Sequence, residues 1–248
     1  GESSMSKVFY PFTEQPKTEQ KSKNEDWQIE ENYLNLWGYL RRRYPNVDLE
    51  EKKLGIAGGS IDKSWLLFRA YLKKNTGKDG KKFVKPIFVA PPLLNKLIIK
   101  NEIDAVLNYW HYKARLQSLG FRELISVKEI LENLGVKTKI PSFGWVFDEK
   151  FGQENIETIN NFFNASKEAK KIMMTSDSEW ERIYPLTLAD DRAALIHLRD
   201  AYRSGIPLKF DSQEIQEINK VFKILSEFGG RDLIGKKNEI APGTFWKQ

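Results

Sequence analysis

The chain has 248 residues, 40% of them hydrophobic, with 40 lysines and arginines against 34 aspartates and glutamates. This length supports one large domain or two small ones. The formal net charge of +6 comes from scattered basic residues. No nucleic-acid-binding motif accompanies them, so no nucleic-acid partner is expected. The sequence has no cysteine and two histidines, which excludes disulfides, thiolate metal sites, thiol catalysis and a multi-histidine metal site.

The first 50 residues offer little that predicts a folded core. Residues 1–26 are mostly polar and charged and predict an extended arm. Within this arm the apolar segment Val8–Phe12 is expected to dock on another surface. Residues 27–50 predict an amphipathic helix, Trp27–Arg43, that is stopped by Pro45 and followed by a linker. The whole chain contains no apolar run of about 18 residues, so no transmembrane segment is expected.

Residues 51–141 alternate strands with helices. Apolar runs predict strands at Leu54–Ala57, Pro86–Val89 and Ile103–His111, and the pattern at Lys63–Lys74 predicts a helix. A β-α-β-α-β order implies parallel strands joined by right-handed crossovers. The expected fold class is therefore α/β, with a mostly parallel sheet and flanking helices.

Residues 142–248 predict a helix-rich region. One further strand is expected at Ser142–Phe147, and the tail Ala241–Trp246 is expected to pack against the body. Asp190 and Asp191 lie near the start of an expected helix and are interpreted as capping residues. Helices are expected at Val127–Leu134, Asn155–Met174, Leu188–Arg203 and Ser212–Phe228.

The turn after the first strand is the first candidate binding site. Gly58, Gly59 and Ser60 stand between a buried strand and a helix, so backbone N–H groups and the positive end of the helix point at one place. Such a place binds anionic or polar ligands; a tight turn that requires small residues is an equal alternative. Asp62 is a further candidate ligand contact, although a helix N-cap is its favoured interpretation.

The end of the third predicted strand is the second candidate binding site. Asn108, Tyr109, Trp110 and His111 follow an apolar run, at the edge of a parallel sheet where ligands commonly bind. Sealing of the core by the aromatic rings is the alternative. His111 has no partner nucleophile in view, so no catalytic residue, metal or cofactor is predicted.

Five motifs in a fixed order resemble one protein family. The chain is similar, over about residues 48–248, to the nitrate/sulfonate/taurine-type solute-binding proteins of ABC importers. The resemblance implies a type II periplasmic-binding fold, with two α/β lobes around a cleft. It also implies delivery of a small anion, sulfonate or pyrimidine precursor to a membrane permease, outside the cytoplasm after signal removal. The motifs are Gly58–Trp65, Ala90–Leu94, Asp104–His111, Phe143–Phe147 and Ala241–Trp246.

The chain departs from this family at its beginning. Family members usually start with a β-α-β-α-β segment that builds most of the first lobe, and residues 1–50 contain no such pattern. Residues 51–141 resemble the second lobe, and residues 142–248 resemble the helix-rich remainder of the first. We therefore expect either another polypeptide that completes the first lobe or a cover formed by the helix at 27–43, because open sheet edges are normally paired or covered.

Two functions follow. The first is binding of a small anionic or polar solute as part of an ABC importer, without enzymatic activity. The alternative is a ligand-free structural subunit of a larger assembly, for example in an organelle, that contacts its neighbours through residues 1–43. An enzyme of the pyrimidine-precursor synthase type is disfavoured, because such an enzyme is expected to need more than the two histidines present.

Overall fold

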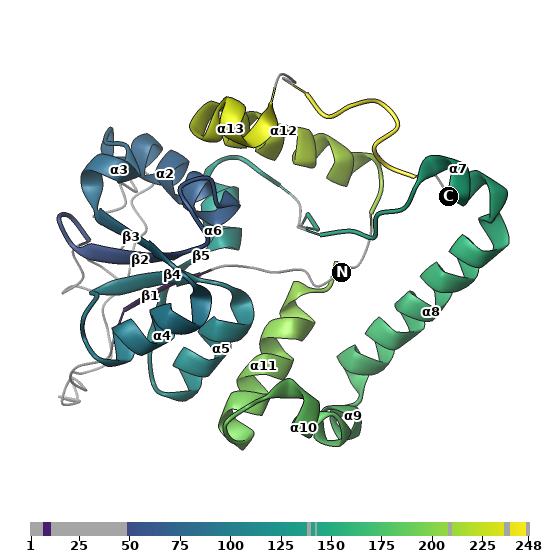
Figure 1. Cartoon of the computed structure of the whole chain (residues 1–248), viewed down its shortest axis with the longest axis horizontal. Helices are drawn as coiled ribbons and strands as arrows, with labels where there is room; N and C mark the ends of the chain where they lie inside the picture. The colour runs from purple at the N-terminus through teal and green to yellow at the C-terminus, as the bar shows by residue number, and fades with distance from the viewer. Residues whose placement is uncertain are drawn as a thin grey trace, which may run out of the picture.

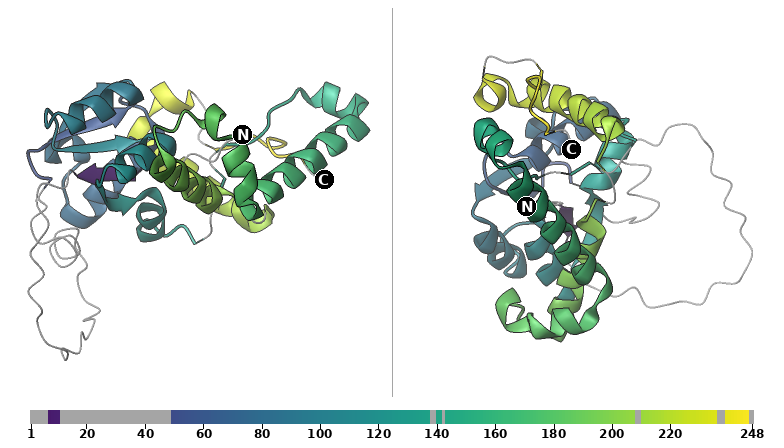
Figure 2. Two further views of the ribbon diagram at one scale, coloured as in Figure 1. Left: turned by 90° about the horizontal axis from the view of Figure 1, so that it is seen from below. Right: turned by 90° about the vertical axis from the view of Figure 1, so that its right-hand side faces the viewer.

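The chain forms an α/β body from which a helical arm projects (Figures 1 and 2). The five strands lie in the order β3-β2-β4-β1-β5. They are β1 (Lys7–Tyr10), β2 (Lys53–Ala57), β3 (Lys85–Val89), β4 (Ala105–Asn108) and β5 (Arg122–Ser126). The computed structural model describes residues 7–10, 49–137, 140–141, 143–207, 210–235 and 239–246, so the predicted helix at 27–43 lies outside the described residues.

One half of the sheet is parallel, as the sequence predicts. β2 lies between β3 and β4, and Leu54 stands opposite both Pro86 and Ala105. Leu54 and Ile56 are fully buried, because helices cover both faces of this part of the sheet. The expected α/β fold class is confirmed.

The other half of the sheet is antiparallel and was not predicted. β1 pairs with β4 on one side and β5 on the other, so part of the predicted polar arm 1–26 is a strand in the middle of the sheet. The predicted strand Ile103–His111 is wrong at both ends, because only Ala105–Asn108 is a strand and Trp110 already begins a helix. The apolar run continues past the end of the strand because its last residues belong to the following helix and are buried there.

Helices form a layer on each face of the sheet (Figure 1). On one face lie α2 (Lys63–Thr76), α3 (Gly80–Phe83) and α6 (Val127–Asn133). Ser126 and Glu129 form a capping box at the start of α6. On the other face lie α4 (Pro91–Ile99) and α5 (Trp110–Ser118). Two clusters of buried side chains lie on opposite faces of the sheet. A third, smaller cluster joins α5 to the later helices through Trp110, Ala114 and Leu198.

The region after residue 142 is helical, and the predicted strand at 142–147 is wrong. Residues 143–148 have no regular secondary structure, and Trp145 and Val146 are exposed. An apolar run forms a strand only beside another strand, and none lies next to it among the described residues. The helices are α7 (Glu149–Glu154), α8 (Ile156–Thr175), α9 (Asp177–Arg182), α10 (Tyr184–Thr187), α11 (Arg192–Gly205), α12 (Ser212–Gly229) and α13 (Arg231–Ile234).

The arm consists of α7 and α8 and projects away from the sheet (Figure 2). The chain returns through α9 and α10 to α11, which begins at the predicted cap Asp191 and packs on α5. Arg115 of α5 donates hydrogen bonds to the carbonyl oxygens of Thr187 and Leu188. The tail was expected to pack against the body, but residues 241–244 are exposed, and the ring of Trp246 lies 5.1 Å from that of Phe147 in the coil before α7. Within the described chain, every helix is too short or too polar to cross a bilayer.

The guanidinium of Arg69 holds α12 against α2. Arg69 is 7% exposed; it donates two hydrogen bonds of 2.9 and 2.8 Å to the Asp79 carboxylate and one of 2.7 Å to the carbonyl oxygen of Phe228. The hydrogen bond from Arg69 is the main reason that the pKa of Asp79 lies below its usual value. A buried, bidentate charge pair of this kind is strongly orienting.

We predict that Arg69→Met lowers the free energy of unfolding by about 2 kcal/mol, because it leaves Asp79 and the Phe228 carbonyl without their partner. Lys82→Met, which removes an exposed positive charge nearby, is the control and should change stability by less than about 0.5 kcal/mol. Urea unfolding of both variants measures the difference. Equal stabilities would show that Arg69 does not hold the two helices together.

Candidate functional site

A cavity of about 640 Å³ lies beside the carboxyl ends of β2 and β4. Its walls come from the start of α2, the β4–α5 turn, α6, α12 and the coil residues Ile140, Pro141, Phe143 and Ile240. Figure 1 shows α12 lying over α2, so that segments far apart in the sequence enclose the space. Volumes of about 300–1,000 Å³ are typical of pockets for small molecules.

Most of the cavity wall is apolar. The apolar side chains come from α2, α5, α6, α12 and the coil segments and are Leu67, Trp110, Val127, Leu131, Ile140, Pro141, Phe143, Ile218, Val221, Phe222, Leu225 and Ile240. The polar and charged lining residues are Asp62, Lys63, Ser64, Tyr109 and His111, which come from the starts of α2 and α5. The cavity therefore has an apolar body and one polar end.

Asp62 caps α2 and takes the place that the sequence analysis assigned to a bound anion. Its Oδ1 accepts hydrogen bonds from the backbone N–H of Ser64 at 2.9 Å and of Trp65 at 3.3 Å. Burial raises the pKa of Asp62, and the hydrogen bonds with Trp65 and Ser64 and the charge of Lys63 oppose that rise. A carboxylate at this position repels an anion, since like charges at short range are destabilising.

Gly58 brings Asp62 and Tyr109 together. Its φ of +84° lies in the left-handed region that favours glycine. A Cβ at this position would lie 3.3 Å from Tyr109 Oη and 3.4 Å from Asp62 Oδ2. Desolvation and the negative charge of Asp62 raise the pKa of Tyr109, so its phenol stays protonated. The tight-turn interpretation thus applies to Gly58, whose small size lets two polar groups meet.

The predicted residues divide between those that line the cavity and those that do not. Gly58, Gly59 and Ser60 lie beside it and do not line it. Asn108 is fully buried and donates to the carbonyl oxygen of Pro91 and to Asn95 Oδ1, while its own Oδ1 accepts from the Tyr109 N–H. These three bonds fix the β4–α5 turn, so Asn108 positions Tyr109.

Trp110 and His111 line the cavity with part of their surfaces. The remaining surface packs against neighbouring aromatic side chains. The Trp110 ring lies 6.1 Å from that of Tyr202 in α11, and Tyr202 in turn lies 5.5 Å from Trp180 in α9. His111 lies 5.4 Å from Trp110 and 4.5 Å from Tyr112, measured between ring centroids. Both interpretations of these aromatic residues, ligand contact and core sealing, are thus compatible with their positions.

Several lining residues could not be assigned from the sequence alone. The Lys63 ammonium lies 4.5 Å from the centre of the Phe143 ring at the cavity, which is a cation–π contact. Val221, Phe222 and Leu225 stand on the apolar face of α12. The amphipathic pattern of α12 indicated that this face is covered, but a periodicity does not say by which partner.

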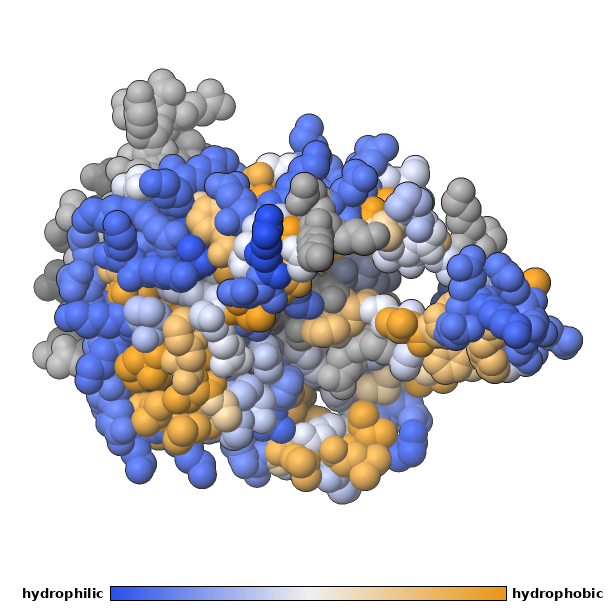
Figure 3. Space-filling model, turned by 45° about the horizontal axis from the view of Figure 1, so that its top comes forward, coloured by the Kyte–Doolittle hydropathy of each residue, from blue (hydrophilic) through white to orange (hydrophobic). Residues whose placement is uncertain are grey.

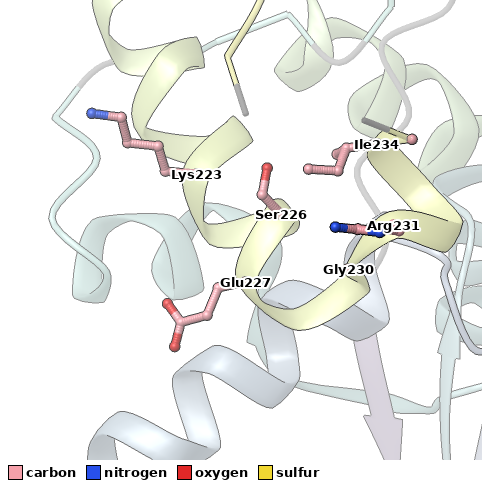
Figure 4. Close-up of a pocket in the computed structure, with 7 residues that line it drawn as sticks. Lys223, Ser226, Glu227, Gly230, Arg231 and Ile234 are labelled. Carbon is pink, nitrogen blue, oxygen red and sulfur yellow. The ribbon is translucent and has the colours of Figure 1, made fainter. Parts of the chain in front are cut away.

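A second hollow, of about 700 Å³, lies at the junction of α12 and α13. Figure 4 shows Lys223 and Glu227 on one side of α12, and Ser226, Arg231 and Ile234 on the other. The Ser226 hydroxyl donates to the Phe222 carbonyl oxygen of its own helix. All of the lining residues come from one stretch of chain, and their polar groups do not converge, so we assign no site to this hollow. In the part of the chain that the structure describes, no three His, Asp or Glu side chains gather to hold a metal ion.

The comparisons with known proteins support the fold. No family model and no curated protein matches the sequence. The chain is similar to the periplasmic aliphatic sulphonate binding protein SsuA from Escherichia coli, with a TM-score of 0.58 and 14% identity over 98% of this chain and 68% of that one. It is also similar to the alkanesulfonate-binding protein SsuA from Xanthomonas axonopodis pv. citri bound to MOPS, with a TM-score of 0.47 and 11% identity over 73% of this chain and 59% of that one. The first similarity shows a periplasmic-binding-protein-like fold.

We predict that Gly58→Ala lowers the free energy of unfolding by about 1–2 kcal/mol, because it forces a side chain into a left-handed backbone conformation and against Tyr109. Gly59→Ala is the matched control, since no atom lies within 4 Å of its added Cβ, and should cost less than about 0.5 kcal/mol. Thermal unfolding followed by circular dichroism compares them. A Gly58→Ala protein as stable as Gly59→Ala would contradict this role of Gly58.

Proposed function

We propose that this chain is a non-enzymatic solute-binding protein that holds a small solute in the cavity between α2 and α12. The observation that carries the proposal is an apolar cavity with one polar end beside the carboxyl ends of two parallel strands. Ligands of open α/β sheets bind at this edge. The solved structures with a similar fold are binding proteins by name, which supports binding in preference to catalysis.

The proposed solute has a largely apolar body. Twelve of the seventeen lining residues are apolar, so burial of apolar solute surface would supply most of the affinity. The sequence led us to expect an anionic or polar solute. Of these two, the anion is disfavoured, because the carboxylate of Asp62 faces the place where an anion would bind. We further propose that residues 51–141 form one lobe and 142–248 part of another, and that the protein serves an ABC importer outside the cytoplasm.

We predict that 4-phenylbutan-1-ol, a neutral probe with an apolar body, binds the wild-type chain and raises its melting temperature, because binding to the folded state stabilises it. Leu131→Trp should abolish this shift by filling the cavity. Leu119→Trp, at a residue that is 60% exposed outside the cavity, should leave the shift unchanged. Isothermal titration calorimetry checks the affinities. No binding to the wild type, or equal binding to Leu131→Trp, would contradict the proposed site.

The arm favours a second candidate function, that of a subunit in a larger assembly. Ile156 is 55% exposed, Phe162 44% and Ile172 48%, all on α8. Figure 3 shows apolar and polar side chains on opposite sides of the projecting arm. The proposed occupant of the apolar side is a second polypeptide, because exposed apolar surfaces of this kind are normally covered by a partner.

If the arm is such an interface, the chain by itself should self-associate through it as the protein concentration rises. We predict that the double variant Ile156→Glu/Ile172→Glu stays monomeric in sedimentation velocity, because a charge on each site opposes burial. Lys150→Glu, on a strongly exposed residue of α7, is the control for added negative charge and should associate as the wild type does. A double variant that associates as strongly as the wild type would contradict the role of this apolar side as an interface.

A further inference from the structure

Two residues at the polar end of the cavity, Asp62 and Tyr109, each place a side-chain oxygen atom close to Gly58. Asp62 Oδ2 and Tyr109 Oη both lie within 3.4 Å of the place where a Cβ on Gly58 would be. Asp62 Oδ1 is already used by the backbone of α2. Tyr109 Oη makes no hydrogen bond with the residues that the structure describes. Two oxygen atoms that can accept hydrogen bonds thus lie beside the same glycine, and both belong to residues that line the polar end of the cavity.

The charge at this end is that of a carboxylate. No basic side chain forms an ion pair with Asp62 within the described part of the chain. The two other titratable groups beside it are Lys63 and His111. The Lys63 side chain is exposed and lies over the Phe143 ring, so water screens much of its charge. Asp62 is half-buried, and burial raises its pKa, which shows that its ionised form lacks full compensation there.

We propose, on the basis of the proposed cavity, that the solute is an organic cation: a primary ammonium group attached to an apolar body. The ammonium would donate hydrogen bonds to Asp62 Oδ2 and Tyr109 Oη, since it carries three donors and no acceptor. Its charge would compensate the carboxylate, and hydrogen bonds between charged groups are the strong ones. The apolar body would lie against Val221, Phe222 and Leu225 of α12.

The aromatic walls fit the same ligand. Trp110, Phe143 and Phe222 line the cavity, and rings attract a cation over their faces. Phe143 already holds the Lys63 ammonium in this way. A sulfonate would bind less well at this end of the cavity. The carboxylate would repel its negative charge, and the apolar wall would offer it few hydrogen-bond donors.

The test compares three probes with one body and three head groups: 4-phenylbutan-1-amine, 4-phenylbutan-1-ol and 4-phenylbutane-1-sulfonate. With the wild-type chain at neutral pH, isothermal titration calorimetry should give affinities that decrease in the order amine, alcohol, sulfonate. The affinity for the amine should exceed that for the alcohol by roughly tenfold or more. Asp62→Asn keeps the N-cap, because Asn and Asp cap equally well, and removes the charge. This variant should weaken the amine by roughly 10- to 100-fold and the alcohol by less than about threefold.

Asp191→Asn is the matched control. Asp191 caps α11 with a 2.7 Å hydrogen bond from the Ala194 N–H and lies outside the cavity, so this variant changes the net charge equally and should leave all three affinities unchanged. Equal binding of amine and alcohol, tighter binding of the sulfonate, or an Asp62→Asn variant that still prefers the amine would overturn the proposed cation and leave the cavity in place. Failure of all three probes to bind would overturn the proposed function itself.

Discussion

The packing of α12 on α2 is the contact on which the candidate site depends. The two helices are more than 130 residues apart in the chain, and Arg69 joins them by binding Asp79 and the Phe228 carbonyl. With α12 in this place, its apolar side chains become one wall of a cavity whose polar end is the start of α2. Without it, the sheet edge at β2 and β4 would face water, and the charge of Asp62 would be screened.

The sequence predicts the parallel half of the sheet because its signals are local. β2, β3 and β4 are short apolar runs, the first two of them beside glycine or proline, and Ser126 and Glu129 form a capping box within four residues. The antiparallel half depends on distant pairing. β1 joins β4 across about 100 residues, and β5 begins with Arg122 and Glu123, so neither has a pattern that stands out. The prediction of a strand at 142–147 was wrong for the opposite reason. The apolar run is typical of a strand, but among the described residues no other strand lies beside it.

The candidate site was predictable in part, on the same grounds. Asp62, Tyr109, Trp110 and His111 were found because they follow strands, and the structure places all four at the cavity. The wall formed by α12 was not predictable, because helical periodicity indicates that one face is buried but does not identify what covers it. At the helix start, where an anion was expected, the Asp62 carboxylate accepts hydrogen bonds from the N–H groups of Ser64 and Trp65. The arm remains the feature that a solute-binding role does not use, and its exposed apolar residues are the reason to retain an assembly role as the second function.

The central claim, that a solute binds between α2 and α12, is tested most directly by the place where a probe makes contact. We would record intermolecular nuclear Overhauser effects between methyl-labelled protein and 4-phenylbutan-1-ol. The account predicts contacts from the probe to Leu131, Val221 and Leu225, which line the cavity. Contacts confined to Ile156 and Ile172 on the arm would contradict it, because the probe would then be covering exposed apolar surface and leaving the cavity empty.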